Sequence, residues 1–191
     1  MENPHAREKL INAIICFASK CRYVGETKLY KLLSYLDFIH YRQTGRSVTN
    51  LDYFALPKGP VPLELMNEVK NLDMANEDLR SAITFSQGKA KNDYDMKIIS
   101  PKKKFDPQHL TKRELKIIDD LVYIFKDVTA KDISEASHFK GHPWEKTRNT
   151  KGENQKIDFS LVFDERDKKQ LAPEEIAARI EEMEESENFL K

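Results

Sequence analysis

The chain has 191 residues, which is enough for one domain with a short appendage. Apolar residues make up 39% of it, and 32 Lys and Arg balance 32 Asp and Glu, so the overall charge gives no electrostatic reason to bind nucleic acid or a membrane. The longest apolar cluster, at 11–18, is too short to cross a bilayer.

Two amphipathic helices are predicted first. Apolar residues recur at three- and four-residue spacings over 6–20 and again over 27–43. Gly45 follows the second helix at the position where a C-terminal cap needs positive φ. Cys16 and Cys21 lie five residues apart and point to different sides of the first helix. We therefore expect no local disulfide and, in the absence of a secretory leader pattern, a cytoplasmic protein.

A short extended segment and a corner come next. Tyr53 and Phe54 point to opposite sides of a strand predicted at 52–56, so one of the two aromatic rings should be buried. Gly59-Pro60-Val61-Pro62 predicts a rigid corner, and Pro62 is well placed to open a third helix that ends near residue 71.

The second half begins with a predicted hairpin over 81–100, which could pair with the 52–56 strand in one small antiparallel sheet. Capping patterns at Thr111 and Thr129 predict helices that run to about 125 and 138. Pro143 opens a third short helix, followed by a polar loop at 149–155. Residues 157–163 are interpreted as a short strand or an irregular docked segment.

The fold class expected from these elements is α+β, with one mainly helical domain over 6–163 and a small antiparallel sheet. A terminal helix is predicted at 173–191, where seven Glu against two basic residues give a net charge of −5. The remainder of the chain then carries +5. This segment, which contains Glu174 and Glu175, is interpreted either as a solvated helix or as an acidic arm that meets a basic partner.

Candidate reactive groups are few. His138 and His142 are four residues apart, but Gly141 and Pro143 interrupt the helix that would align them for a metal. Asp37 and His40 are expected to make surface or capping hydrogen bonds rather than acid–base pairs. Glycine is scarce, and neither a phosphate loop nor a nucleophile elbow is present. We therefore predict no enzyme, with no catalytic residue, cofactor or metal.

Helices predicted between 111 and 149 have the lengths of a helix-turn-helix, which would place a DNA-reading element at 129–149. Nine basic and seven acidic residues between Thr111 and Lys151 leave only +2, which is weak for a recognition surface. Binding to nucleic acid is therefore not expected, although a DNA-binding regulator is kept as an alternative.

Two sequence blocks resemble one known family. KLLSYLDFIHYRQTGRSVTNLDYFALPKGPVP, from Lys31 to Pro62, is similar to the hallmark of the Panacea domain, the family of SocA-like antitoxins and phage-associated GepA-type proteins. A second block from Leu110 to Trp144, with Ser137-His138 followed by Trp144, is similar to the family's second half.

The resemblance implies a bacterial or prophage antitoxin whose partner is a cognate toxin protein, bound directly. The alternative within the family is an adaptor that delivers the toxin to a protease. Neutralisation needs no reactive group and a standard interface of about 1,600 Å² would suffice. The residues predicted to contact the partner lie in the corner, near the second block and in the acidic segment. They are Tyr53, Phe54, Lys58, Gly59, Pro60, His138, Trp144, Glu174 and Glu175.

Overall fold

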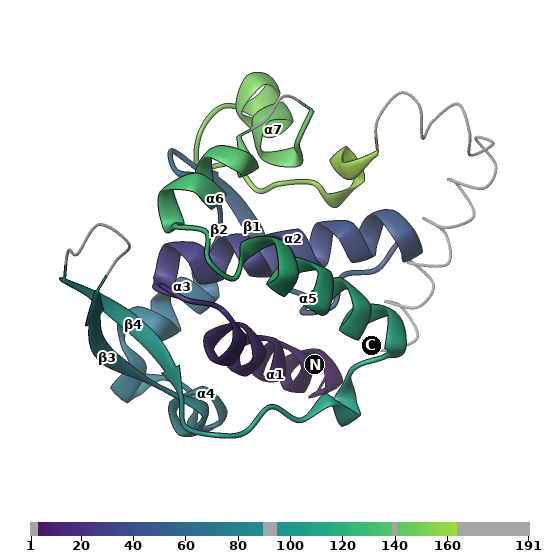
Figure 1. Ribbon diagram of the computed structural model, residues 1–191. Coiled ribbons are helices and arrows are strands. Elements are labelled where there is room, and N and C mark those ends of the chain that lie inside the picture. Colours follow the sequence, from purple (N-terminus) through teal and green to yellow (C-terminus); the bar gives the residue numbers. More distant parts are fainter. Residues whose placement is uncertain (1–3, 90–94, 139–140, 164–191) are drawn as a thin grey trace.

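The computed structural model describes residues 4–89, 95–138 and 141–163 (Figure 1). Its α-helices in these ranges are α1 (Pro4–Lys20), α2 (Glu26–Thr44), α3 (Leu63–Lys70), α4 (Glu77–Ala82), α5 (Lys112–Phe125), α6 (Ala130–Ser137) and α7 (Pro143–Lys151). The strands are β1 (Tyr53–Leu56), β2 (Gly59–Pro62), β3 (Ile83–Lys89) and β4 (Asp95–Pro101). Short 3₁₀ helices are η1 (Leu72–Met74), η2 (Pro107–His109) and η3 (Phe159–Val162).

The predicted fold class is confirmed, because the described chain is a mainly helical α+β structure, but the single sheet is wrong. The strands form two separate two-stranded antiparallel sheets, β1 with β2 and β3 with β4. The predicted corner folds back as β2, with Leu56 opposite Gly59 across the turn. The other edge of β1 is hydrogen-bonded to residues 154–157, so no edge is left there for the 83–101 hairpin.

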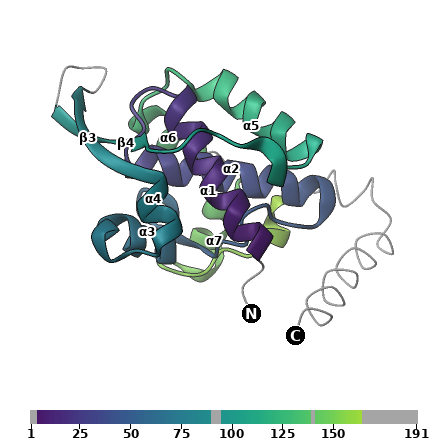
Figure 2. The ribbon, with the colours of Figure 1, turned by 90° about the horizontal axis from the view of Figure 1, so that it is seen from below.

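Helix α2 crosses the middle of the molecule, with α6 and α7 on one side and α1 on the other (Figures 1 and 2). It is therefore buried on most of its surface, including Lys28, Lys31 and Asp37 as well as its leucines. Gly45 ends α2 at φ 73°, and its N–H donates to the carbonyl oxygen of Tyr41 at 2.7 Å, as the sequence predicts.

Several boundaries differ from the sequence-based expectation. Helices η1 and α4 were not predicted. Helix α4 includes residues 81 and 82, which were assigned to the start of the hairpin, and it buries Leu79 and Ala82 completely. Helix α7 continues to Lys151, into the predicted polar loop. Residues 159–162 form a 3₁₀ helix, so the strand alternative for 157–163 is wrong. The alternative of a docked segment agrees with the burial of Ile157, whose N–H donates to the Tyr53 carbonyl oxygen.

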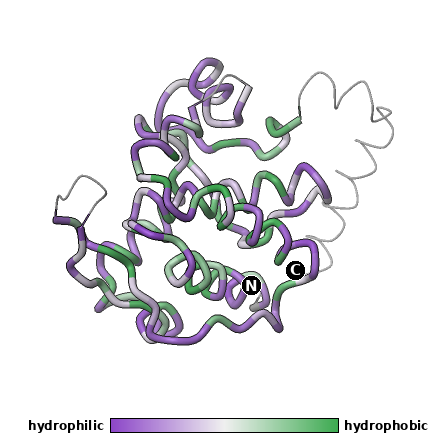
Figure 3. The backbone as a smooth tube through the Cα atoms, in the orientation of Figure 1, coloured by the Kyte–Doolittle hydropathy of each residue, from purple (hydrophilic) through white to green (hydrophobic). Residues whose placement is uncertain are grey.

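Both predicted N-terminal caps are present. Thr111 and Glu114 form a complete capping box, while Thr129 accepts the Asp132 N–H in a one-sided cap. Hydrophobic segments gather where α1, α2 and α5 face each other, and α7 is mostly hydrophilic (Figure 3). In the described ranges, no helix has the length and apolar character needed to cross a membrane. The acidic segment 173–191 lies outside the described residues, and the domain boundary at 163 stays a prediction.

Candidate interaction surface

In the folded protein the corner consists of residues 56–60, where the chain turns from β1 into β2. Side chains from three helices hydrogen-bond to its backbone. Trp144 on α7 donates its Nε1–H to the Leu56 carbonyl oxygen at 2.8 Å. Ser134 on α6 donates its hydroxyl to the Lys58 carbonyl oxygen, also at 2.8 Å. Lys31 on α2 donates from Nζ to the Pro60 carbonyl oxygen at 2.8 Å. The two halves of the chain therefore meet at the corner and fix its backbone.

Gly59 is required at the corner by both conformation and space. Its φ of +107° is one that residues with a side chain rarely adopt. A Cβ built there would lie 2.7 Å from Lys31 Cε and Nζ and 2.7 Å from Ser137 Oγ. The backbone of β2 thus packs directly on these two side chains, and no side chain fits between them.

Next to the corner, the rings of His138 and Trp144 stack with centroids 4.0 Å apart and an angle of 16° between their planes. The guanidinium of Arg148 lies 4.8 Å from the Trp144 ring centroid, in a cation–π contact. Burial lowers the pKa of His138, which favours the neutral ring. His142 instead packs edge-on against Tyr35, so the two histidines serve separate packing contacts.

The exposure of the predicted contact residues divides them into two groups. Lys58 is exposed, while Phe54 and His138 are partly exposed. The buried group consists of Tyr53, Gly59, Pro60 and Trp144. In this conformation the residues of the buried group pack inside the fold and do not form its outer surface. Glu174 and Glu175 lie outside the described residues.

Tyr53 has an internal partner that the sequence did not reveal. Its hydroxyl donates to Asp37 Oδ2 at 2.7 Å in a fully buried network. Asp37 Oδ1 also accepts the backbone N–H groups of Val48 and Thr49 at 2.7 and 2.9 Å, and Oδ2 accepts the Thr49 hydroxyl. The expected surface or capping bond of Asp37 is therefore wrong: this carboxyl group anchors the loop between α2 and β1 to the core.

Lys31 is the second buried ionisable group of α2, with 1% of its surface exposed. Burial lowers its pKa to about 7, because the ammonium loses the hydration that favours the charged form. A lysine of lowered pKa near a serine can activate a nucleophile. Ser137, however, is itself buried and donates its hydroxyl to the Ser134 carbonyl oxygen at 2.7 Å. Lys31 and Ser137 are therefore enclosed, and both pack against the backbone of the corner at Gly59.

Helix α7 carries three basic residues, and the charged ends of two of them, Lys146 and Arg148, contact other parts of the chain. Lys146 donates to the carbonyl oxygens of Leu161 and Phe163 at 2.7 and 2.9 Å. Arg148 is paired with Glu153 as well as lying over Trp144. Ile133 of α6 is completely buried. Among the described residues of 129–149, these three side chains are therefore engaged in contacts within the chain.

Sequence reasoning missed the buried polar residues of α2 for a physical reason. Lys28 and Lys31 share one side of α2, and Asp37 lies on the opposite side. Charged residues spread around a helix in this way are usually solvated. Lys28 Nζ instead donates to the carbonyl oxygens of Arg22 and Val128 at 2.7 and 2.6 Å. All three residues are buried because other elements pack around α2 on more than one side.

Comparison with known proteins gives one match. Residues 29–145 match the family model described as antitoxin SocA-like, Panacea domain. The matched stretch is more than half of the chain and contains Lys31, the corner, His138 and Trp144. The curated proteins and the solved structures gave no match.

Proposed function

The chain belongs to the family of SocA-like antitoxins with a Panacea domain, and on that premise we propose that it neutralises a cognate toxin by binding it directly. The family match over residues 29–145 is the observation that carries the proposal. Neutralisation of this kind needs a specific surface and no reactive group. We propose accordingly that the protein is not an enzyme and acts in the cytoplasm, beside its toxin.

The corner is the proposed contact surface. Lys58 is exposed at its turn, Leu56 within it is partly exposed, and so is Phe54 just before it in β1. Together they offer an aromatic and an aliphatic side chain with a neighbouring charge. Aromatic anchors surrounded by polar groups are typical of binding hot spots. The carbonyl oxygens of Leu56, Lys58 and Pro60 are already hydrogen-bonded inside the protein. The surface is therefore rigid before a partner arrives, which lowers the entropy cost of binding.

The test is a growth assay that expresses the product of the flanking gene with and without this protein. Relief of growth inhibition together with a complex recovered by affinity purification supports direct neutralisation. A neighbour that is toxic but is neither bound nor neutralised contradicts the proposal for that pair. Repeating the assay in strains that lack individual proteases separates occlusion from delivery to a protease, because only delivery loses its protection when the protease is absent.

A further inference from the structure

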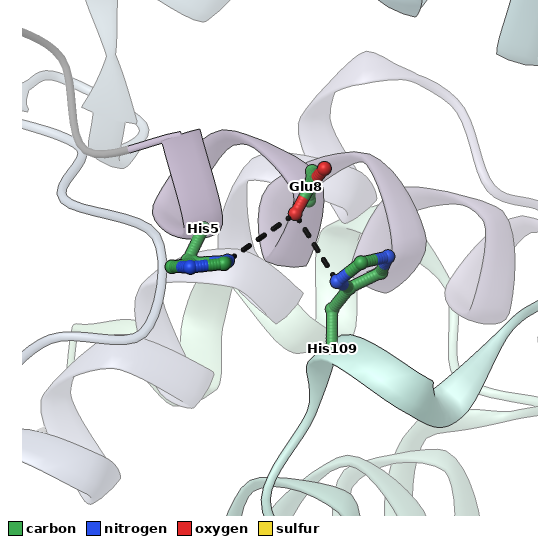
Figure 4. Close-up of side chains that lie close together, drawn as sticks. All are labelled: His5, Glu8 and His109. Atoms are coloured by element: carbon green, nitrogen blue, oxygen red, sulfur yellow. Dashed lines mark ion pairs between the residues drawn. The ribbon is translucent and has the colours of Figure 1, made fainter.

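A cluster of two histidines and a glutamate lies on elements that do not form the corner. His5 and Glu8 are three residues apart in the first turns of α1 and so share a face, and His109 ends η2 (Figure 4). Both imidazole rings point towards the Glu8 carboxylate. One donor atom from each residue lies within 4.8 Å of the other two. About a hundred residues separate Glu8 from His109 in the sequence, so no local spacing could have revealed the group.

The separations of these atoms are close to those around a zinc ion. Bonds from Zn²⁺ to imidazole nitrogen and carboxylate oxygen are about 2.0–2.2 Å, which makes the edge of a tetrahedron of ligands about 3.3–3.6 Å. Glu8 Oε2 lies 3.4 Å from His5 Nδ1 and 3.1 Å from His109 Nδ1. Small rotations of the side chains therefore suffice to place three ligands around one ion.

The backbone that carries His109 is fixed against α1. The Asp106 N–H donates to Asn12 Oδ1 on α1 at 3.1 Å, and Asp106 Oδ1 accepts the Gln108 N–H at 3.0 Å. On the other side of His109, Leu110 is buried in the core. The imidazole is thus presented from an anchored turn, which reduces the cost of arranging the ligands.

Gln108 supplies an outer contact for the same ring. Its side-chain nitrogen lies 3.0 Å from His109 Nε2. A metal on Nδ1 requires the proton on Nε2, and the Gln108 carboxamide, turned by 180°, would present its oxygen to accept that proton. Hydrogen bonds of this type to the second ring nitrogen are usual for metal-binding histidines.

We propose that His5, Glu8 and His109 bind one Zn²⁺ ion and leave its fourth position to water or another ligand. Two imidazole nitrogens with one carboxylate suit zinc, whereas calcium and magnesium prefer oxygen ligands alone. The side chains of Glu8 and His109 are 47% and 28% exposed, so an ion can enter from solvent. The bound ion ties the start of α1 to the segment that leads into α5. This proposal is independent of the antitoxin function.

The two cysteines do not compete for the ion in the folded protein. Cys16 and Cys21 are both buried. Burial raises the pKa of both thiols, that of Cys16 to about 11, and zinc binds the thiolate. Zinc bound by the native protein is therefore expected at the histidine cluster.

The experiment titrates the full-length, tag-free protein, first stripped with a chelator, with zinc chloride in a calorimeter. The expected result is one Zn²⁺ per chain, with affinity at least tenfold weaker in His109→Ala and in Glu8→Gln. Glu64→Gln is the matched control, because Glu64 is an exposed glutamate in the first turn of α3. It should bind zinc as the wild type does.

Cobalt chloride provides a second readout, since tetrahedral Co²⁺ gives intense visible absorption bands. These bands should appear with the wild type and with Glu64→Gln, and should be lost in His109→Ala. Circular dichroism verifies that each variant is folded. Failure of the wild type to bind zinc overturns the proposal. Binding that survives both His109→Ala and Glu8→Gln also overturns it, because the ion would then occupy another place.

Discussion

At the scale of single residues, the most consequential side chains are polar groups enclosed within the fold. Asp37 is completely buried and accepts four hydrogen bonds. Lys31 is almost completely buried and donates to the Pro60 carbonyl oxygen of the corner. A buried polar group is tolerated only where partners replace water. These two residues therefore fix the position of the loop before β1, and of the corner after β1, relative to α2.

Asp37→Asn should destabilise the protein by about 2–4 kcal/mol, because an amide nitrogen cannot accept the bonds that a carboxylate oxygen accepts. The control is Asp52→Asn, since Asp52 is an exposed residue paired with Lys156 at the surface. That change should cost less than about 1 kcal/mol. Urea unfolding of both variants measures the difference, and equal midpoints would contradict a structural role for the Asp37 network.

Lys31 should make stability depend on pH. Its pKa is about 7 in the folded protein and 10.5 ordinarily, so between these values the unfolded chain holds a proton that the folded chain has released. Raising the pH from 7 towards 10 therefore stabilises the fold, while below pH 7 the cost of the buried charge is fully present.

Lys31→Met removes this contribution, so the stability of the wild type relative to Lys31→Met should rise by a few kcal/mol, on the order of the pKa difference, between pH 7 and 10. Lys104→Met, at an exposed lysine, should follow the wild type. Denaturant unfolding at several pH values supplies the comparison. Parallel profiles for wild type and Lys31→Met would show that Lys31 does not carry the shift.

At the scale of elements, the β1–β2 hairpin is the piece that joins the two halves of the chain. Helices α6 and α7 follow it in sequence by more than sixty residues, yet both are hydrogen-bonded to its turn. Burial alternates along β1: Tyr53 and Ala55 are buried, whereas Phe54 and Leu56 are partly exposed. The hairpin thus has an inner side that packs on α2 and a partly exposed side, which is the one proposed to meet a partner.

Gly59→Ala tests how tightly the hairpin packs on α2. The new methyl group would collide with Lys31 and Ser137, in addition to straining the backbone. Gly152→Ala is the control for strain alone, because Gly152 also has a positive φ, +94°, with nothing within 4 Å of its Cβ position. We expect Gly59→Ala to lower thermal stability more than Gly152→Ala, by about 1–3 kcal/mol beyond the strain. Equal losses would mean that the corner can shift without cost.

At the scale of the whole molecule, the sequence predicted most helices and the family. It did not predict features that depend on contacts between segments far apart in the chain. Periodicity and caps located α1, α2 and α5, because these signals are local. The pairing of β1 with β2 and with residues 154–157 depends on tertiary contacts, and so does the burial of Lys31 and Asp37. The grouping of His5, Glu8 and His109 is of the same kind. For the corner, the sequence located the turn but did not indicate which of its side chains are buried.

The proposed activity belongs to the whole molecule, because a rigid core centred on α2 would present the corner to a toxin. Lys58 is the exposed charge at its tip, and its side chain can be changed without disturbing the bond that its carbonyl oxygen accepts from Ser134. Lys58→Glu should therefore leave stability within about 0.5 kcal/mol of the wild type while weakening the complex. Lys104→Glu makes the same charge change at another exposed lysine.

The most direct measurement is the growth of cells that express the product of the flanking gene together with the wild type, Lys58→Glu or Lys104→Glu, at matched protein levels. Direct neutralisation through the corner predicts that the wild type and Lys104→Glu restore growth and that Lys58→Glu does so poorly. A toxic neighbour that the wild type fails to neutralise would contradict the antitoxin function for that pair. Full protection by Lys58→Glu would leave neutralisation standing and contradict the role of Lys58 at the corner.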